Sequence, residues 1–323
     1  MIPFSDLPPF VLARRTLDAE SERLGLLHRA YIGGEALDAW VAGIAPEKRL
    51  RYGLDDLGAV MVAALAFDEG PAGPPHSPAS PPLARLGRFA RANWYGELLA
   101  RLKASAVAAR AALAAAGVDP GPARLWRQLA NSGLPERPLA LAAGLGRLGR
   151  SGLLLVPKDG PGVVLGLLLL PRRLGGSLPA EAKAFRASGR GDPAETCGSC
   201  RACVDACPTG ALLSEGGFER ERCIQHWTSR AGRLPAFVEE RWGDRLYGCD
   251  SCTEACPRFS DRSTVVPTLG LLGPGLPAAE IAAASDTELR TRFKGSVLGQ
   301  AWIEPEALRR NARLCLAAAG PSI

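Results

Sequence analysis

Hydrophobic and polar positions in the first 170 residues alternate between strand and helix patterns. The apolar run 57–67, LGAVMVAALAF, predicts a buried strand. Residues 97–117 carry apolar side chains at helical spacing and end at a glycine, which predicts a helix with a glycine cap. The runs 153–156 and 163–170 flank the turn sequence PKDGPG, so we expect a β-hairpin there.

The later part of the chain has a different pattern. A long loop is expected at 69–82, which is rich in Pro and Gly. A helix that begins near Arg137 is expected to run into a glycine-rich turn. Residues 196–257 are rich in cysteine, and the chain from Pro277 onward is expected to be mostly helical, with 306–320 as the last helix.

Composition adds that the chain can form a packed core. Of its 323 residues, 47% are hydrophobic and 22% are charged. No apolar run approaches the roughly 20 residues needed to cross a bilayer, and the first residues do not resemble a secretory signal. We therefore expect a cytoplasmic protein with reduced thiols and no membrane association. The net charge of +6 and pI near 9.0 suit a polyanionic partner, or simply a solvated surface.

The cysteine spacing carries the most specific chemistry. Four cysteines follow the pattern C-x2-C-x2-C-x3-C-P, and they are Cys197, Cys200, Cys203 and Cys207. This is the bacterial ferredoxin spacing, in which three thiolates hold one 4Fe–4S cluster and the fourth binds a second cluster. A zinc module is the alternative, but zinc sites use paired C-x2-C elements instead of three cysteines and then one.

The remaining cysteines complete two sets of four. The segment CDSCTEACP repeats C-x2-C-x3-C-P, so its last cysteine can complete the first set. We expect one cluster to be held by Cys197, Cys200, Cys203 and Cys256 and the other by Cys207, Cys223, Cys249 and Cys252. Cys315 lies among Leu and Ala in the last predicted helix, and we expect it in the core.

The segment GLGRLG, from Gly144 to Gly149, matches the G-x-G-x-x-G pattern of dinucleotide-binding proteins. That fingerprint requires a strand before it and a helix after it. Here a helical pattern precedes the glycines and a strand pattern follows them, so we do not expect a nicotinamide cofactor. The glycines indicate close approach of the backbone to a strand or to a planar cofactor.

Several segments together resemble the epoxyqueuosine reductase family. They include CGSCRACVDACPTGA, CIQHWTSRAGRLP, YGCDSCTEACP and ERPLALAAGLGRLGRSGLLL, with WYGELLARLK and LRRNA extending the similarity. The similarity covers most of the chain from about Leu57 onward. It implies an oxidoreductase that passes electrons from two 4Fe–4S clusters to a cobalamin, which reduces the epoxide of epoxyqueuosine in tRNA. A low-potential donor such as ferredoxin or flavodoxin and a monomeric state are also expected.

The resemblance further implies a fold class and a cofactor site. We expect an α+β protein with an α/β cobalamin-binding-type domain at 1–185, a ferredoxin-like two-cluster domain at 190–262 and a C-terminal helical segment at 263–323. The corrin is expected to need no histidine ligand from the protein. The residues expected to bind the cofactor are Tyr95, Asn131, Gly144, Gly146, Gly149 and Arg150.

The sequence departs from the family at the catalytic acid. Relatives carry an Asp, the proton donor to the epoxide, six residues before the Glu of the ERP segment, and here that position is Ala130. The catalytic residue is therefore left unassigned. A reductase of another substrate and an electron-transfer protein without its own substrate stay open as alternatives. Arg309, Arg310 and Arg313 on the last predicted helix are expected to face tRNA or water.

Overall fold

The computed structural model describes residues 7–67, 82–175, 193–214, 216–260 and 265–319. The chain divides into two compact units that are discontinuous in sequence. Unit 1 comprises Met1–Leu65, Tyr95–Leu148 and Val163–Pro193, and unit 2 comprises Ala66–Trp94, Gly149–Gly162 and Ala194–Ile323. The loop expected at 69–82 lies almost entirely outside the described residues. No helix in the described part of the chain has the length and apolar character needed to span a bilayer.

Unit 1 is built on a four-stranded sheet. In spatial order its strands are β1 (His28–Gly33), β2 (Leu57–Ala66), β7 (Val163–Pro171) and β4 (Gln128–Ala130). β1 is antiparallel to β2, and β4 is antiparallel to β7 with Ala130 opposite Gly166. Both central strands are buried along most of their length, as the apolar runs at 57–67 and 163–170 predict.

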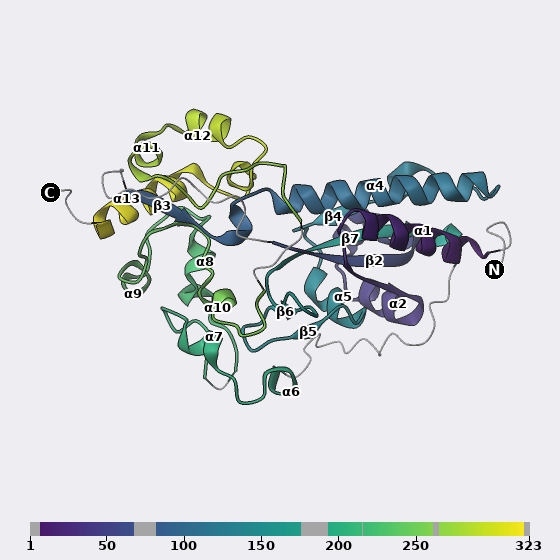
Figure 1. Ribbon diagram of the computed structural model, residues 1–323, viewed down its shortest axis with the longest axis horizontal. Coiled ribbons are helices and arrows are strands. Elements are labelled where there is room, and N and C mark those ends of the chain that lie inside the picture. Colours follow the sequence, from purple (N-terminus) through teal and green to yellow (C-terminus); the bar gives the residue numbers. More distant parts are fainter. Residues whose placement is uncertain (1–6, 68–81, 176–192, 215, 261–264, 320–323) are drawn as a thin grey trace. The chain divides into compact units, whose positions relative to one another are not determined.

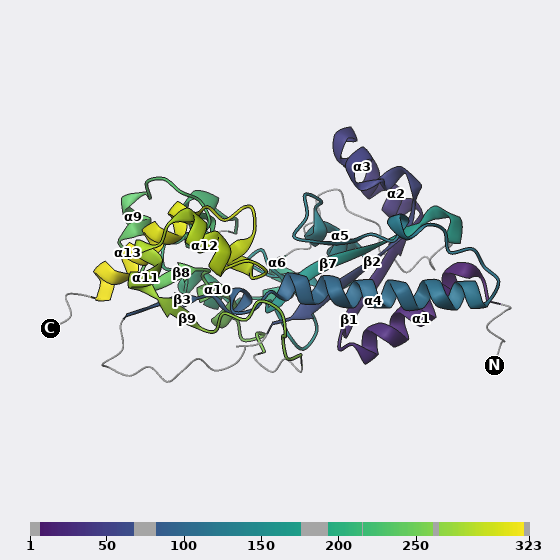
Figure 2. The same ribbon diagram turned by 90° about the horizontal axis from the view of Figure 1, so that it is seen from above.

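Helices cover both faces of this sheet. They are α1 (Pro9–Arg23), α2 (Gly34–Ala42), α3 (Pro46–Tyr52), α4 (Trp94–Ala115) and α5 (Glu136–Ala142). Figures 1 and 2 show α1 and α4 on one face and α2 and α5 on the other. A buried hydroxyl pair, Ser21 and Ser105 at 3.2 Å, joins α1 to α4. The layered arrangement explains why adjacent side chains of β2 and β7 are both buried.

The predicted helix at 97–117 is confirmed as α4. It begins three residues earlier, at Trp94, and ends before Gly117, whose φ of 74° is the left-handed conformation that glycine adopts readily. The helix predicted from Arg137 is confirmed as α5, and the chain turns at Gly144 with φ of 75°.

The predicted β-hairpin at 153–170 is wrong. The first run forms only the short strand β6 (Leu154–Leu155), and its turn closes locally through a bridge between Val156 and Gly160. β7 pairs instead with β2 and β4. A run as apolar as β7 is stabilised by a central position with neighbours on both edges, which a two-stranded hairpin cannot provide.

Unit 2 has its core around a small sheet and the C-terminal helices. β3 (Leu83–Leu86) lies between β8 (Arg245–Tyr247), which is parallel to it, and β9 (Gly275–Pro277), which is antiparallel. The helices α11 (Ala278–Ala283), α12 (Asp286–Arg292) and α13 (Pro305–Ala319) gather beside one another in Figure 1 and bury apolar side chains with β3. Cys315 is 3% exposed within this core, as expected.

Short elements complete the fold. The short helices of the cysteine-rich segment are α6 (Pro193–Cys197), α7 (Ala202–Asp205), α8 (Ile224–Trp227), α9 (Ala236–Glu239) and α10 (Ser251–Glu254). A further short strand is β5 (Arg147–Leu148). The 3-10 helices are Leu54–Asp56, Arg88–Ala90, Ala123–Leu125, Arg172–Leu174, Arg220–Arg222 and Val297–Gly299.

The two units differ from the three consecutive domains expected from sequence. The expected boundary near 185–190 coincides roughly with the last change of unit, at Pro193. However, Ala66–Trp94 and Gly149–Gly162 belong with the cysteine-rich segment, because β3 pairs with β8 and β9 and because Gly160 packs against Arg258. The helical segment 263–323 also belongs to unit 2, since its helices share one core with β3.

Candidate iron–sulfur site

Seven of the eight clustered cysteines lie on two similar backbone segments, and Cys223 lies between these segments in sequence, directly before α8. A four-residue helix, α7, begins two residues after Cys200, and another, α10, begins two residues after Cys249. In both segments the N–H of the last cysteine closes the turn, Cys207 onto the carbonyl of Val204 and Cys256 onto that of Thr253, each at 3.1 Å. α7 and α10 pack against each other. The repeated C-x2-C-x3-C-P spacing thus folds into a repeated local structure.

The thiols influence one another in groups that support the two expected sets. Burial raises the pKa of Cys203, and the thiolates of Cys197 and Cys256 raise it further. Burial also raises the pKa of Cys223, with added contributions from Cys249 and Cys207.

Among the clustered cysteines, the most strongly affected thiol is Cys252. Burial raises the pKa of Cys252 to about 12, and the nearby charges of Cys249, Cys223, Cys207 and Cys203 add to this effect. Four of these five cysteines form the second expected set, and Cys203 belongs to the first. Thiolates held this close together need a strongly cationic partner to stay ionised, and an iron–sulfur cluster is such a partner.

Hydrogen bonds to sulfur are already present at three cysteines. Burial opposes ionisation of Cys207, but backbone N–H groups of Leu212, Thr209 and Ala211 outweigh it and lower the pKa of that thiol. The N–H of Ala211 lies 3.2 Å from its Sγ. The N–H of Arg150 lies 3.4 Å from Cys197 Sγ, and Ser251 Oγ lies 3.6 Å from Cys249 Sγ. Such bonds stabilise thiolate ligands and tune cluster potentials.

The donor set fits two clusters. All nine cysteines are free thiols, and the eight clustered ones are at least partly accessible, whereas Cys315 is buried. Among the described residues, no three His, Cys, Asp or Glu side chains converge closely enough to hold one metal ion. In a cubane each iron takes one thiolate, so the sulfurs surround the cluster instead of meeting at a point.

Arg150 contacts the cysteine loop instead of open solvent. Its Nε donates to the carbonyl of Cys200 at 3.1 Å, and a terminal nitrogen donates to the carbonyl of Gly198 at 2.9 Å. The family resemblance predicts that Arg150 contacts the cobalamin. Its guanidinium is committed in this structure to the backbone beside two predicted cluster ligands.

The other residues predicted to bind a cofactor lie near the ends of elements. Tyr95 is in the first turn of α4 and is half-buried. Asn131 follows β4 and is exposed with φ of 48°, an uncommon conformation for a residue other than glycine. Asparagine adopts this left-handed conformation more readily than most residues, so the backbone alone does not mark a site and the cofactor contact of Asn131 stays a prediction.

The glycines of the GLGRLG segment have local structural roles. Gly144 terminates α5, with its N–H on the carbonyl of Leu141, and the space where a Cβ would lie is open. A Cβ on Gly149 would meet the side chain of Leu155 at 3.1 Å. Gly146 lies between them and is half-buried. As predicted, a helix precedes this segment, and β5 lies within it.

A half-buried carboxyl, that of Glu136, lies beside the loop that follows Ala130. Glu136 Oε1 accepts the N–H of Ser132 at 2.8 Å. Burial raises the pKa of Glu136, although hydrogen bonds from Ser132 and Asn131 partly oppose this shift. In the sequence, Glu136 is recognisable only as the first residue of the ERP segment, and no role is predicted for it. The signal in the sequence that could have indicated this contact is the spacing, because Glu136 follows the polar loop residue Ser132 by four positions.

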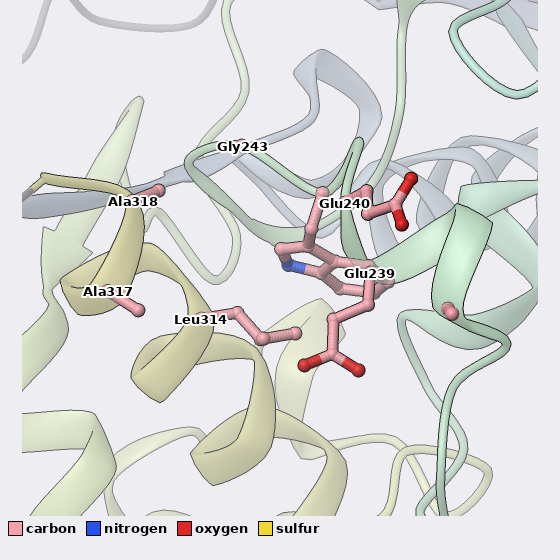
Figure 3. Close-up of a pocket in the computed structure, with 8 residues that line it drawn as sticks. Glu239, Glu240, Gly243, Leu314, Ala317 and Ala318 are labelled. Atoms are coloured by element: carbon pink, nitrogen blue, oxygen red, sulfur yellow. The ribbon is translucent and has the colours of Figure 1, made fainter.

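A pocket of about 500 Å³ lies elsewhere in unit 2 and contains none of the clustered cysteines. Its walls come from α9, α13 and the turn between α9 and β8 (Figure 3). Glu239 and Glu240 stand on its rim, and Trp242 and Leu314 supply its apolar surface. Because its charged groups are carboxylates, it does not suit a phosphate or another polyanion.

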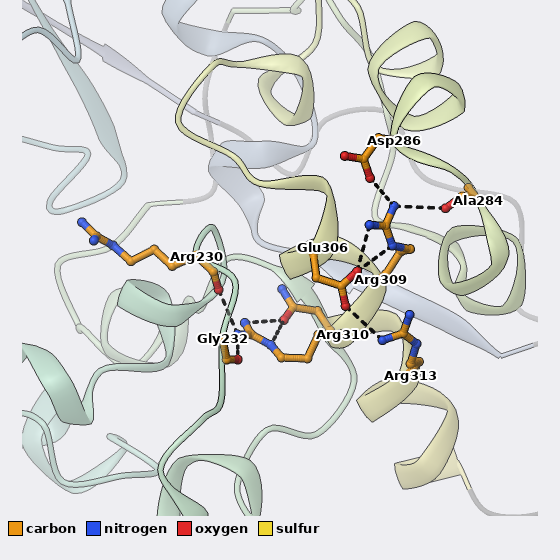
Figure 4. Close-up of polar contacts among 9 residues, drawn as sticks. Arg230, Gly232, Ala284, Asp286, Glu306, Arg309, Arg310 and Arg313 are labelled. Carbon is orange, nitrogen blue, oxygen red and sulfur yellow. Dashed lines mark hydrogen bonds and ion pairs between the residues drawn. The ribbon is translucent and has the colours of Figure 1, made fainter.

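The arginines of the last helix are used within the protein (Figure 4). Arg309 pairs with Asp286 and Glu306, and Arg313 pairs with Glu306. Arg310 donates to backbone carbonyls, including those of Arg230 and Gly232. The expectation that these side chains face tRNA or water does not describe Arg310, whose guanidinium is half-buried.

Comparisons with known proteins agree with this site. Residues 196–258 match the family described as a 4Fe-4S double cluster binding domain. A Staphylococcus aureus epoxyqueuosine reductase is 31% identical over 241 residues, which cover 72% of this chain and 57% of that protein. The epoxyqueuosine reductase of Gloeobacter violaceus is 28% identical over 93% of both chains.

Solved structures show the same fold. The epoxyqueuosine reductase from Bacillus subtilis, solved with a catalytic aspartate loop swung out of the active site, has a TM-score of 0.71 and 22% identity over 96% of this chain and 82% of its own. An epoxyqueuosine reductase with an epoxyqueuosine-modified tRNA stem loop has a TM-score of 0.67 over the same shares of both chains.

Fold, cysteine segments and matches together define an iron–sulfur protein with two 4Fe–4S clusters. The chain belongs to the epoxyqueuosine reductase family. It spans little more than half the length of the Staphylococcus aureus relative that it matches.

Proposed function

We propose that this chain is an iron–sulfur oxidoreductase that delivers electrons from its two clusters to a cobalamin and reduces the epoxide of epoxyqueuosine in tRNA. The observation that carries the proposal is the pair of complete cysteine sets in a chain whose fold matches epoxyqueuosine reductase structures over nearly its whole length. The relative solved with a modified tRNA stem loop supports tRNA as the substrate.

The proposed ligand sets are those derived from spacing. One cluster is held by Cys197, Cys200, Cys203 and Cys256, and the other by Cys207, Cys223, Cys249 and Cys252. A low-potential ferredoxin or flavodoxin is the proposed electron donor, and the proposed location is the cytoplasm, where the thiols stay reduced.

Cobalamin, when bound, supplies a cobalt centre that accepts single electrons and delivers them to a carbon–oxygen bond. Among the residues proposed to contact it, Asn131 offers an exposed amide at the end of β4 and Gly144 offers open backbone at the end of α5. Neither described histidine is among the residues proposed to contact the cobalamin: His28 lies in β1, and His226 lies in α8, three residues after the proposed cluster ligand Cys223. The third histidine, His76, lies outside the described residues.

The proton that an opened epoxide requires has no assigned donor. A positioned acid contributes on the order of 100- to 10,000-fold to such a step. Ala130, the last residue of β4, provides none. Glu136 is a half-buried carboxyl whose pKa is raised, so it holds a proton more readily than an exposed glutamate, and it contacts the loop that begins at Asn131.

A second candidate function follows from the alanine at position 130. Because Ala130 replaces the expected acid, the chain can be a cobalamin-dependent reductase of a different substrate. A third candidate is an electron-transfer protein that uses the clusters alone.

Two measurements separate these candidates. The absorption spectrum of anaerobically reconstituted protein, recorded with and without added cobalamin, should show a corrin bound in stoichiometric amount. Absence of corrin binding would favour the electron-transfer function.

The second measurement is reduction of epoxyqueuosine in tRNA by the native chain, Ala130→Asp and Glu136→Gln. Slow native turnover that Ala130→Asp accelerates would support the proposed reaction with a missing acid. Native turnover that Glu136→Gln abolishes would identify Glu136 as the acid. Cobalamin binding without turnover by any of the three proteins would favour a different substrate.

A further inference from the structure

Two groups of residues that are not cysteines contact the cysteine-rich segments through hydrogen bonds and close packing. One group comes from the segment 149–162, which enters unit 2 from the middle of the sequence. The other comes from α13, the last helix. The first group contacts backbone within and next to the loop 197–200, and the second contacts backbone of the segments that follow Cys223 and precede Cys249; both lie entirely within unit 2.

The first group begins at Arg150. Three donors of this one residue reach the loop 197–200: its backbone N–H points at Cys197 Sγ, and its guanidinium bonds the carbonyls of Gly198 and Cys200. A guanidinium has a rigid fork of donors, so bonds to two carbonyls fix the loop more firmly than an ammonium would.

The same segment also approaches the last ligand of that set. Gly160, with φ of 60°, lies so close to Arg258 that a Cβ would overlap its carbonyl, and a Cβ on Gly162 would overlap the ring of Phe259. Arg258 in turn donates to the carbonyl of Thr196 at 3.0 Å. Thr196 directly precedes Cys197, and Arg258 lies two residues after Cys256, so both ends of the first set are fixed.

The second group is centred on Arg310. Its guanidinium donates to three backbone carbonyls, those of Trp227 at 2.6 Å, Arg230 at 2.8 Å and Gly232 at 2.9 Å. Figure 4 shows it reaching from α13 toward the loop that holds Arg230 and Gly232. It also lies 5.5 Å from the centre of the Trp242 ring. This loop follows α8, the helix that begins directly after Cys223.

Asn311 extends the second group to another cysteine. It is fully buried, and its Nδ2 donates to the carbonyl of Thr228 at 2.9 Å and to that of Leu246 at 2.8 Å. Leu246 lies in β8, three residues before Cys249. The N–H of Cys249 donates to Gln225 Oε1 at 3.1 Å, which joins the two segments again beside the ligands.

We propose that the two clusters are positioned by separate side chains: Arg150 positions the ligand loop of the first, and Arg310 with Asn311 positions the ligand segments of the second. The inference rests on the cysteine sets of the proposed function. These arginines are positioning residues, because they bond to backbone and not to a cluster. A guanidinium near a cluster also favours the more negative, reduced state, so its removal lowers that cluster's potential.

The test compares Arg150→Met and Arg310→Met in the anaerobically reconstituted full chain. Redox titrations followed by electron paramagnetic resonance give the potential of each cluster, and a chelator gives its rate of iron loss. Cys200→Ser and Cys223→Ser identify which signal belongs to which set. Arg313→Met is the matched control, because Arg313 lies on the same helix and pairs with Glu306 of that helix at 3.1 Å.

We expect Arg150→Met to lower the potential and speed iron loss about 10-fold only for the cluster that Cys200→Ser alters. Arg310→Met should do the same only for the cluster that Cys223→Ser alters, and Arg313→Met should change neither. Arg310→Lys keeps the charge but cannot reach three carbonyls, so it should give a smaller effect on the same cluster. It also provides the readout should Arg310→Met fail to fold.

Equal effects of Arg150→Met and Arg310→Met on both clusters would overturn the inference, as would an equal effect of Arg313→Met. In that case two intact 4Fe–4S signals would leave the proposed function standing, because the assay contains neither cobalamin nor tRNA. Protein that holds zinc and no iron–sulfur cluster would overturn both.

Discussion

Gly160 combines a left-handed backbone with a contact that leaves no room for a side chain. Gly34 has the same φ of 60° but open space around its Cα, so the two positions form a matched pair. We expect Gly34→Ala to cost about 1–2 kcal/mol, the cost of the backbone conformation. Gly160→Ala should cost roughly 2–5 kcal/mol, because overlap with Arg258 is added. Calorimetric unfolding of both variants measures the difference, and equal costs would show that the contact is absent.

Cys315 is expected to be unreactive and to give stability a particular pH dependence. Burial raises the pKa of Cys315 to about 12 from an ordinary value of 9.0. Its contribution to stability is therefore complete below pH 9 and is lost as pH rises from 9 toward 12, because the unfolded thiol ionises first.

The measurement compares the native chain with Cys315→Ala. The native chain should lose stability relative to this variant by up to about 1.4 kcal/mol per pH unit above pH 9. The iron content of the two proteins should be equal. A lower iron content in Cys315→Ala would contradict its assignment to the core.

The strand β7 illustrates how position in a sheet decides the effect of a substitution. Leu167 and Leu168 point to opposite faces, and neither is exposed. Because helices cover both faces, we expect Leu167→Ala and Leu168→Ala each to cost about 2–5 kcal/mol. Leu165→Ala, at a half-buried position of the same strand, should cost less. Denaturant unfolding tests this, and a large cost on one face only would contradict coverage of both.

Single helices and strands could be predicted where one periodicity runs unbroken through the segment. Which strands pair with one another could not be predicted. The strand at β2 and the helix α4 follow from unbroken runs of one periodicity. The hairpin expected at 153–170 failed because two apolar runs and a turn sequence state which segments extend, but not which strands pair. β7 pairs with β2, about 100 residues earlier in the chain, and no local signal encodes that choice.

At the scale of the whole molecule, cluster content should depend on all parts of unit 2. The full chain, reconstituted without oxygen, should hold about eight iron atoms, four for each cluster. A fragment comprising residues 194–323 contains every proposed ligand but lacks Arg150, Gly160 and β3. We expect it to retain much less iron, because the backbone contacts that fix the loops are missing. Iron analysis of both proteins provides the test. Equal iron content would show that the segments Ala66–Trp94 and Gly149–Gly162 are not needed to hold the clusters.

The cysteine ligands of the candidate site could be predicted from the sequence, but the residues that position the ligand loops could not. Cysteine spacing is set by the geometry of a cluster, so eight ligands could be recognised in the sequence. Arg150 and Arg310 act through backbone carbonyls, which every residue possesses, so no partner residue type reveals the contact in advance. The family resemblance predicts that Arg150 contacts the cobalamin. Only the folded chain shows that its guanidinium bonds the carbonyls of Gly198 and Cys200.

The central position of β3 has a consequence for the order of events during synthesis. Leu83–Leu86 leaves the ribosome early, but its neighbours β8 and β9 follow about 160 and 190 residues later. Pairing over such separations closes long loops and is slow. The early segment must therefore wait unpaired until most of the chain has been translated. Delivery of iron and sulfide should consequently follow translation instead of accompanying it.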